Sequence, residues 1–221
     1  MKKYYLLSFL LLLTSCGKNP ANILDDGGVV KKDLMTGQFV GNYSNLTYIT
    51  DSSHTGTVSS SGAFSCKRGE QIDFYLQTNS VAHDIHVGSA ICTDLISPIS
   101  LVTWGRAAYN ADINTLGVSG ISNDYKVALL RWLRILYLLD SDSNVSNGVS
   151  LSKSDNSLFA NEFKNNPWHP DQVFGNYTAS SLTNNTEFDA AITRLETVLN
   201  KHSYSDSEIE ALINQKSTLL Y

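Results

Sequence analysis

The chain has 221 residues, and its 21 acidic residues outnumber its 16 basic ones to give a formal net charge of −5 at pH 7. A mildly acidic chain without a basic cluster is a poor match for phosphate backbones, so we expect no nucleic-acid binding. The length suits one domain or two small ones. Beyond residues 1–15, no stretch is long and apolar enough to cross a membrane.

Residues 1–15 have the parts of an export signal. Lys2 and Lys3 precede a short apolar run, and small residues then lead to Cys16. This ending resembles a bacterial lipobox, which implies that the signal is removed and that Cys16 acquires acyl chains such as palmitate. Burial of those chains would hold the protein to a membrane without spanning it. The alternatives are an ordinary signal peptide with a chance cysteine and a short membrane anchor.

The resemblance also bears on location and charge. Residue 17 is Gly rather than Asp, which in lipoproteins of two-membrane bacteria implies the outer membrane. Removal of residues 1–15 would leave 14 basic and 21 acidic residues, a net charge of −7. Residues 16–36 are polar and lack periodicity, which predicts a flexible tether between lipid and folded body.

Residues 37–103 are predicted to form an antiparallel β-sandwich domain. Short runs of alternating apolar residues are separated by turn residues, as in Ile72, Phe74 and Leu76, whose neighbours are polar or amphipathic. The strand pattern continues to the end of this range, where Pro98 predicts an edge or an end of a strand.

Part of this pattern resembles a known module. The matching positions include a Gly-Thr strand, a Gly-Phe strand and a Gly-Glu turn, namely Gly41, Leu46, Tyr48, Thr50, Gly56, Thr57, Gly62, Phe64, Gly69, Glu70, Ile72 and Phe74. Together they are similar to the transthyretin-like, carboxypeptidase-regulatory-like sandwich of bacterial envelope proteins. The resemblance implies a structural or ligand-binding module and no particular activity. Cys66 departs from it, because an aromatic residue is more usual there.

Cys66 and Cys92 are the two cysteines other than Cys16. Since an exported chain meets an oxidising space, this even remainder predicts one disulfide. Two buried free thiols are the alternative.

Residues 104–221 are predicted to be helical and to include a central helix at 124–140. That helix is apolar on nearly every face and therefore has to be covered by other structure. Amphipathic periodicity predicts two more helices, at 183–200 and 205–220, the second opened by a capping box of Ser205 and Glu208. The fold class is therefore α+β: an N-terminal antiparallel β-sandwich packed with a small C-terminal helical layer around one buried helix.

The loop after the central helix offers oxygen ligands. Asp140, Asp142 and Asn144 have the one-three-five spacing of calcium loops, so a structural calcium ion is one interpretation. Val145 and Leu151 stand where such loops carry Gly and a bidentate Glu, which favours the alternative of a solvated helix exit. No other cofactor is expected.

Two further signals are weaker. His83 and His86 would converge on a metal only if their segment were helical. Residues 117–121 resemble a nucleophile elbow imperfectly. Aromatic residues could form an exposed binding surface, although they more often lie in a core: Tyr43, Tyr48, Tyr75, Trp104 and Trp168.

The sequence therefore predicts a lipid-anchored envelope or surface protein that acts as a non-enzymatic binding or adhesion module. Its partners would be the membrane through the anchor, and envelope proteins or surface glycans through the sandwich. One alternative is an exported hydrolase with a site between sandwich and helices, near His83, Asp84 or Asp112. Another is a scaffold lipoprotein that binds only other envelope proteins.

Overall fold

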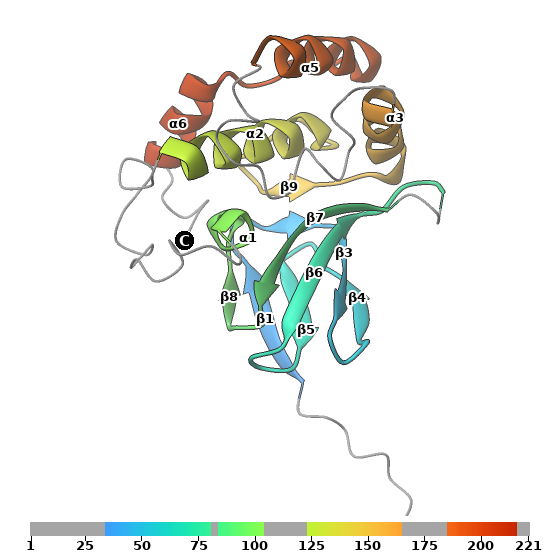
Figure 1. The fold of residues 1–221 in the computed structure, drawn as a ribbon, viewed down its shortest axis with the longest axis vertical. Helices are drawn as coiled ribbons and strands as arrows, with labels where there is room; N and C mark the ends of the chain where they lie inside the picture. The colour runs from blue at the N-terminus through green and yellow to red at the C-terminus, as the bar shows by residue number, and fades with distance from the viewer. Residues whose placement is uncertain (1–33, 81–83, 104–122, 165–184, 216–221) are drawn as a thin grey trace, which may run out of the picture. The chain divides into compact units, whose positions relative to one another are not determined.

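The described part of the chain is strand-rich at its start and helical at its end (Figure 1). The computed structural model describes residues 34–80, 84–103, 123–164 and 185–215, all within one unit, Asp33–Tyr221. The predicted α+β class is confirmed: N-terminal, mostly antiparallel sheets are followed by helices that pack together. Residues 1–33, including Cys16 and most of the predicted tether, lie outside the described residues.

The strands are short, as the frequent turn residues predict. They are β1 Met35–Phe39, β2 Tyr43–Ser44, β3 Leu46–Thr50, β4 Thr55–Thr57, β5 Ala63–Cys66, β6 Gln71–Leu76, β7 Ile85–Ile91, β8 Leu95–Ile96 and β9 Val149–Ser150. The first two residues of β1, at 35 and 36, fall within the predicted tether. The four-stranded sheet has the order β4-β3-β6-β7 and is antiparallel throughout. The three-stranded sheet has the order β5-β1-β8, with β8 parallel to β1.

The two larger sheets share one core. Phe74 of β6 makes edge-on ring contacts with Phe39 of β1, at 5.2 Å between centroids, and with Phe64 of β5, at 5.9 Å. The predicted disulfide is confirmed: Cys66 in β5 is bonded to Cys92, which follows β7, with the Cα atoms 6.1 Å apart. It therefore fastens one sheet to the other, and a loop of this size stabilises a fold by roughly 2–4 kcal/mol.

Five helices are described: α1 Pro98–Thr103, α2 Asn123–Leu139, α3 Lys153–Lys164, α5 Asn185–Leu199 and α6 Asp206–Gln215. α2 is the predicted central helix, and nearly every side chain from Leu129 to Leu139 is buried. The indole Nε1 of Trp132 donates a hydrogen bond of 3.2 Å to the Val87 carbonyl in β7. The same ring lies 5.4 Å from the ring of Tyr43, so α2 is docked on the strands through a buried aromatic contact.

The two arginines of α2 lie against α5. Arg131 is only 5% exposed, and its guanidinium lies 4.8 Å from the Phe188 ring centroid. Arg134 lies 5.7 Å from the same ring and forms a 2.6 Å ion pair with Asp189. Cation–π contact with Phe188 therefore gives both charges a partner where α2 meets α5.

Three elements differ from the sequence prediction. Residues 98–103 form helix α1 rather than continuing a strand, because proline is well accommodated in the first turn of a helix. Residues 149–150 form β9, which pairs in parallel with β2 across more than a hundred residues of chain. Residues 153–164 form helix α3, which no sequence pattern singled out, and its buried side is limited to Asn156, Phe159 and Phe163.

Candidate functional site

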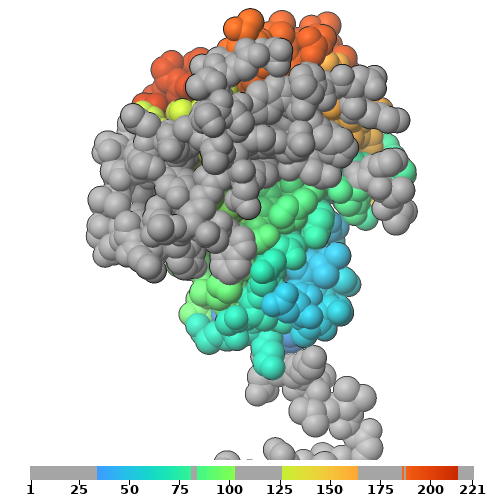
Figure 2. Space-filling view, viewed as in Figure 1, coloured from blue at the N-terminus to red at the C-terminus, as the bar shows by residue number. Residues whose placement is uncertain are grey.

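The candidate site lies on the outer face of the β4-β3-β6-β7 sheet. Alternate residues of each strand point away from the core, and strand pairing aligns them into two rows. The first row is Thr57, Thr47, Tyr75 and His86, and the second is Thr55, Ile49, Asp73 and Ser89. In space-filling form, atoms of the N-terminal strands, coloured blue to green, lie at the molecular surface (Figure 2).

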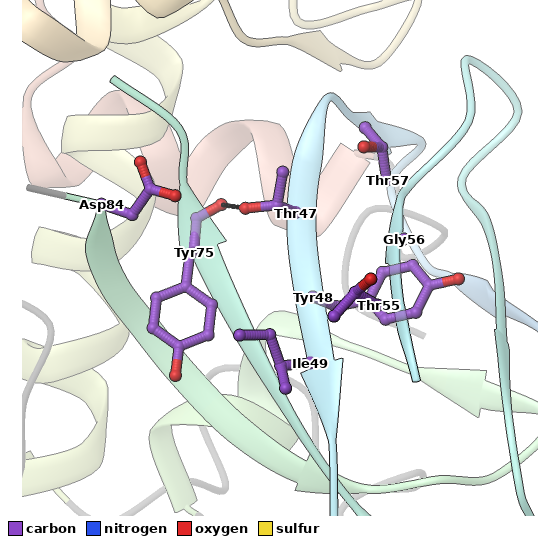
Figure 3. Close-up of a pocket in the computed structure, with 8 residues that line it drawn as sticks. All are labelled: Thr47, Tyr48, Ile49, Thr55, Gly56, Thr57, Tyr75 and Asp84. Atoms are coloured by element: carbon purple, nitrogen blue, oxygen red, sulfur yellow. Dashed lines mark hydrogen bonds between the residues drawn. The ribbon is translucent and has the colours of Figure 1, made fainter. Parts of the chain in front are cut away.

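A groove of about 510 Å³ runs over three of these strands (Figure 3). Its lining consists of Thr47, Tyr48, Ile49, Thr55, Gly56, Thr57, Tyr75 and Asp84. Ile49 is 45% exposed although it sits in the middle of a sheet, so the groove has an apolar centre open to solvent. Hydroxyls and one carboxylate surround that centre.

Gly56 and Tyr48 form the floor of the groove. They are opposite each other in the β3–β4 pair, and a Cβ atom at Gly56 would lie 2.3 Å from the Tyr48 hydroxyl oxygen. The Tyr48 ring is therefore close against the Gly56 backbone, which only glycine allows. The Tyr48 hydroxyl accepts a hydrogen bond of 3.0 Å from the Ser65 N–H, and this fixes the ring from beneath.

Some polar groups of the groove take part in hydrogen bonds within the protein, and others do not. The Thr47 hydroxyl donates to the Tyr75 carbonyl at 3.4 Å, and one Asp84 oxygen accepts the Thr78 N–H at 3.1 Å. The hydroxyls of Thr55 and Thr57 make no hydrogen bond to any residue in the described part of the chain. These two side chains are exposed, so their hydrogen-bonding capacity is open to a ligand.

A polar cluster borders the groove on β6 and β7. One oxygen of Asp73, Oδ1, accepts hydrogen bonds from the Ser89 hydroxyl at 2.5 Å and from the Gln71 amide at 2.9 Å. His86 Nε2 lies 3.2 Å from the Ser89 hydroxyl and 3.6 Å from the same Asp73 oxygen. The His86 ring in turn contacts the Tyr75 ring, with centroids 5.2 Å apart, so the cluster supports one wall of the groove.

Serine, histidine and aspartate also compose hydrolase triads, but this cluster is arranged differently. In a triad the histidine lies between the other two and uses a different ring nitrogen for each. Here the same nitrogen, Nε2, faces both Ser89 and Asp73, and the serine hydroxyl donates directly to the carboxylate. The arrangement suits a positioning network better than a nucleophile with its base.

The loop after α2 satisfies its own polar groups. The Asn144 N–H donates to both Asp140 Oδ2 and Asp142 Oδ1, each at 2.9 Å. Asp140 Oδ1 accepts the Ser150 N–H at 2.8 Å, and Asn144 Oδ1 accepts the Ser146 hydroxyl at 2.6 Å. The three residues proposed as calcium ligands therefore lie in one loop, where their oxygens brace the backbone. Calcium binding there stays a prediction.

Asp140 is fully buried, unlike its neighbour Asp142. Burial raises the pKa of the Asp140 carboxyl to about 6, and the nearby Asp142 carboxylate adds to the rise, while the N–H groups of Ser150 and Asn144 oppose it. The pKa of the exposed Asp142 carboxyl is lowered, first by the hydrogen bond from the Asn147 amide. Asp140 is therefore the carboxyl of this loop that changes charge closest to neutral pH.

No protein-family model, curated protein or solved structure matches this chain. Among the helices that the structure describes, none is long and apolar enough to span a bilayer. Nor do the described residues bring together three or more His, Cys, Asp or Glu side chains in a way that could hold a metal ion.

The other predicted site residues are dispersed. Tyr43 and Tyr48 are core residues, with 0% and 4% exposure, although Tyr48 also forms the groove floor. Tyr75 lines the groove from its open side. Several residues named from the sequence lie outside the described ranges: His83, Trp104, Asp112, residues 117–121 and Trp168. Of the positions proposed for a hydrolase site, only Asp84 is described, and it lies at the groove.

The threonines, Ile49, Asp73 and Ser89 do not stand out as a group in the sequence. A usable signal was present, because the outward positions of β3 and β4 carry Thr47, Ile49, Thr55 and Thr57 in strict alternation with inward ones. Alternation within one strand predicts which side chains share a face. It does not predict which strands are neighbours, and the groove depends on that pairing.

Proposed function

We propose that this chain is a lipid-anchored protein of the bacterial cell envelope that binds a ligand on the outer face of the β4-β3-β6-β7 sheet. The observation that carries the proposal is the groove, which combines an exposed apolar centre with hydroxyl groups open to hydrogen bonding. In this proposal the protein binds its ligand without chemical conversion. The hydrogen-bonding arrangement of Ser89, His86 and Asp73, which differs from that of a catalytic triad, supports that choice.

The anchor part of the proposal is supported by residues 1–16. A positive start, a short apolar run and small residues before Cys16 are the features from which we infer acylation. Gly17 supports placement at the outer membrane. Residues 16–36 would then hold the folded unit away from the bilayer, leaving the sheet face accessible to envelope material.

Metabolic labelling tests the anchor. Cells expressing the full chain or its Cys16→Ala variant would be grown with an alkyne fatty acid and fractionated. We expect the full chain to carry label and to sediment with outer membranes, and the variant to lose both properties. Label and membrane association that survive in the variant would show that Cys16 is not the anchor.

Co-sedimentation tests the binding face. The full-length protein, purified in detergent, would be mixed with a bacterial envelope fraction. Thr57→Arg places a bulky charge in the groove, and Thr193→Arg places the same change on the exposed side of α5. We expect Thr57→Arg to lose most of the binding and Thr193→Arg to retain it. Equal binding by the two variants would remove the sheet face from the proposal, and loss by both would indicate non-specific adsorption.

A further inference from the structure

We propose that the groove binds a neutral oligosaccharide, an inference that rests on the proposed function and gives its ligand a chemical class. Sugars present two kinds of surface: a face of C–H groups and an edge of hydroxyls. A site for them therefore needs an apolar or aromatic platform beside groups that both donate and accept hydrogen bonds. The groove offers these two features side by side.

The platform is formed by Tyr75 and Ile49. Tyr75 is paired with Thr47, and Ile49 is paired with Asp73 at the next outward position, so the two apolar side chains are diagonal neighbours on β6 and β3. Figure 3 shows the Tyr75 ring and Ile49 on the same face of the sheet. Ile49 is 45% exposed, which leaves apolar surface for a sugar ring to cover.

The hydrogen-bonding edge is formed by Thr55, Thr57 and Asp84. Each threonine hydroxyl can donate one hydrogen bond and accept others, so both suit sugar hydroxyls in either orientation. Asp84 uses one carboxylate oxygen for the Thr78 N–H, and the second oxygen makes no hydrogen bond within the described residues. A carboxylate that accepts from a neutral hydroxyl forms one of the stronger types of hydrogen bond.

Charge selects against acidic ligands. The groove lining includes the Asp84 carboxylate and no lysine or arginine. Asp73, next to the groove, adds a second carboxylate, which His86 faces at 3.6 Å. An acidic glycan or a phosphorylated sugar would meet like charge here without a compensating cation, which is a mechanism of exclusion. The ligand should therefore be uncharged.

The platform is held in place before a ligand arrives. The His86 ring contacts the Tyr75 ring at 5.2 Å, and hydrogen bonds around Asp73 and Ser89 hold His86. A fixed aromatic ring lowers the entropy lost on binding. The groove crosses three strands, with neighbouring strands about 4.8 Å apart, so it has room for a short oligosaccharide rather than a single sugar.

An extended peptide is the competing occupant, and the fold favours it less. Peptides commonly add to the free edge of a sheet through backbone hydrogen bonds, but β4, the edge strand that lines the groove, has only three residues. The open groups of this site are side chains on the face, not backbone groups along an edge.

Titration of the full-length protein in detergent with defined oligosaccharides tests the inference. The panel would contain neutral chains, matched chains carrying uronic acid or phosphate, and an extended Ser/Thr-rich peptide, with binding measured by calorimetry. We expect saturable binding of a neutral chain and at least tenfold weaker binding of its acidic counterpart. Tyr75→Ala should weaken binding about tenfold and Tyr75→Phe far less, since the ring is kept.

Ile49→Asp serves as a second variant at an exposed position, and Thr193→Asp is its control. Because the new carboxylate would lie opposite Asp73, circular dichroism and thermal unfolding would first show that the variant is folded. Any of three results would overturn the oligosaccharide assignment. These are binding of acidic chains as tightly as neutral ones, tighter binding of the peptide than of either, and an affinity for the neutral chain that is unchanged by both Tyr75→Ala and Ile49→Asp. If no oligosaccharide binds while envelope co-sedimentation still depends on Thr57, the ligand class is wrong and the binding face stands. If both assays fail, the proposed function fails with them.

Discussion

At the scale of single residues, Asp140 is a carboxyl group whose burial in the fold makes its ionisation less favourable. Its side chain is fully buried and accepts backbone N–H groups from Asn144 and Ser150. Those hydrogen bonds favour the charged form, whereas loss of solvation disfavours it and is the larger effect. The pKa of Asp140 is therefore about 6 in the folded state, against 3.8 for the ordinary group.

This shift predicts a pH dependence of stability. Because the folded state binds the proton more tightly than the unfolded state, the contribution of Asp140 is fully present below pH 4 and is lost as the pH rises to about 6. The loss amounts to about 3 kcal/mol at most. We expect the difference in unfolding free energy between the wild type and Asp140→Asn, measured in urea, to shift by up to that amount between pH 4 and pH 7. A difference between the wild type and Asp140→Asn that stays constant from pH 4 to pH 7 would show that burial does not shift the Asp140 pKa in this way.

Gly56 is the residue on which the groove floor depends. An added methyl group would lie 2.3 Å from the Tyr48 hydroxyl oxygen and 2.5 Å from the ring carbon that carries it. We therefore expect Gly56→Ala to lower the unfolding free energy by about 1–3 kcal/mol, because either the ring or strand β4 has to move. Thr57→Ala, on the same strand but pointing outward, is the matched control and should cost much less. Thermal unfolding of the two variants checks the difference.

At the scale of elements, the C-terminal end of α2 is completed by a distant lysine. The Lys201 ammonium donates to the Asp140 carbonyl at 2.7 Å and to Asp155 of α3 at 2.8 Å. Lys201 follows α5, so one side chain ties together the ends of three helices. The positive charge also lies where the α2 macrodipole favours it.

Removal of this lysine tests its importance for the helical layer. Lys201→Met keeps the aliphatic stem but leaves the largely buried Asp155 without its cation. We expect a loss of about 1–3 kcal/mol in unfolding free energy. Lys126→Met removes a more exposed ion pair with Glu210 and should cost no more than about 1 kcal/mol. The unfolding free energies of the two variants would be compared by urea denaturation. Equal losses of unfolding free energy would mean that Lys201 contributes no more than a surface charge.

The elements also show which helices a sequence can reveal. The capping box before α6 is present as predicted: the Glu208 carboxylate accepts the Ser205 N–H at 2.7 Å, and the Ser205 hydroxyl accepts the Glu208 N–H at 3.3 Å. α2 was predicted from its nearly continuous run of apolar residues, and α5 was predicted from its amphipathic periodicity. α3 has only a narrow apolar side, so its signal was the cap alone, in which the Asp155 N–H donates to the Ser152 hydroxyl.

At the scale of the whole molecule, local patterns predicted more of the fold than of the site. The fold class follows from the alternation of apolar residues in the first half and helical patterns in the second. The disulfide follows from the number of cysteines, and the central helix follows from its run of apolar residues. Each of these signals can be read within short stretches of sequence. The β2–β9 pair joins Tyr43 to Val149, and the groove joins three strands; both depend on contacts between distant segments. Such contacts are set by the packing of the whole core, so the sequence predicted a sandwich without showing which outward residues meet on its surface.

Because one core runs through the described strands and helices, the two halves should unfold together. Trp132 is the most direct link: its ring is 1% exposed, contacts Tyr43 and donates to the Val87 carbonyl. We expect Trp132→Phe to lower the unfolding free energy by about 2–4 kcal/mol through lost volume and the lost hydrogen bond. Far- and near-ultraviolet circular dichroism should report a single transition at a lower temperature, whereas Val198→Ala, at an exposed site of α5, should leave it nearly unchanged. Two separate transitions, with only the helical one displaced, would mean that the strands fold without α2.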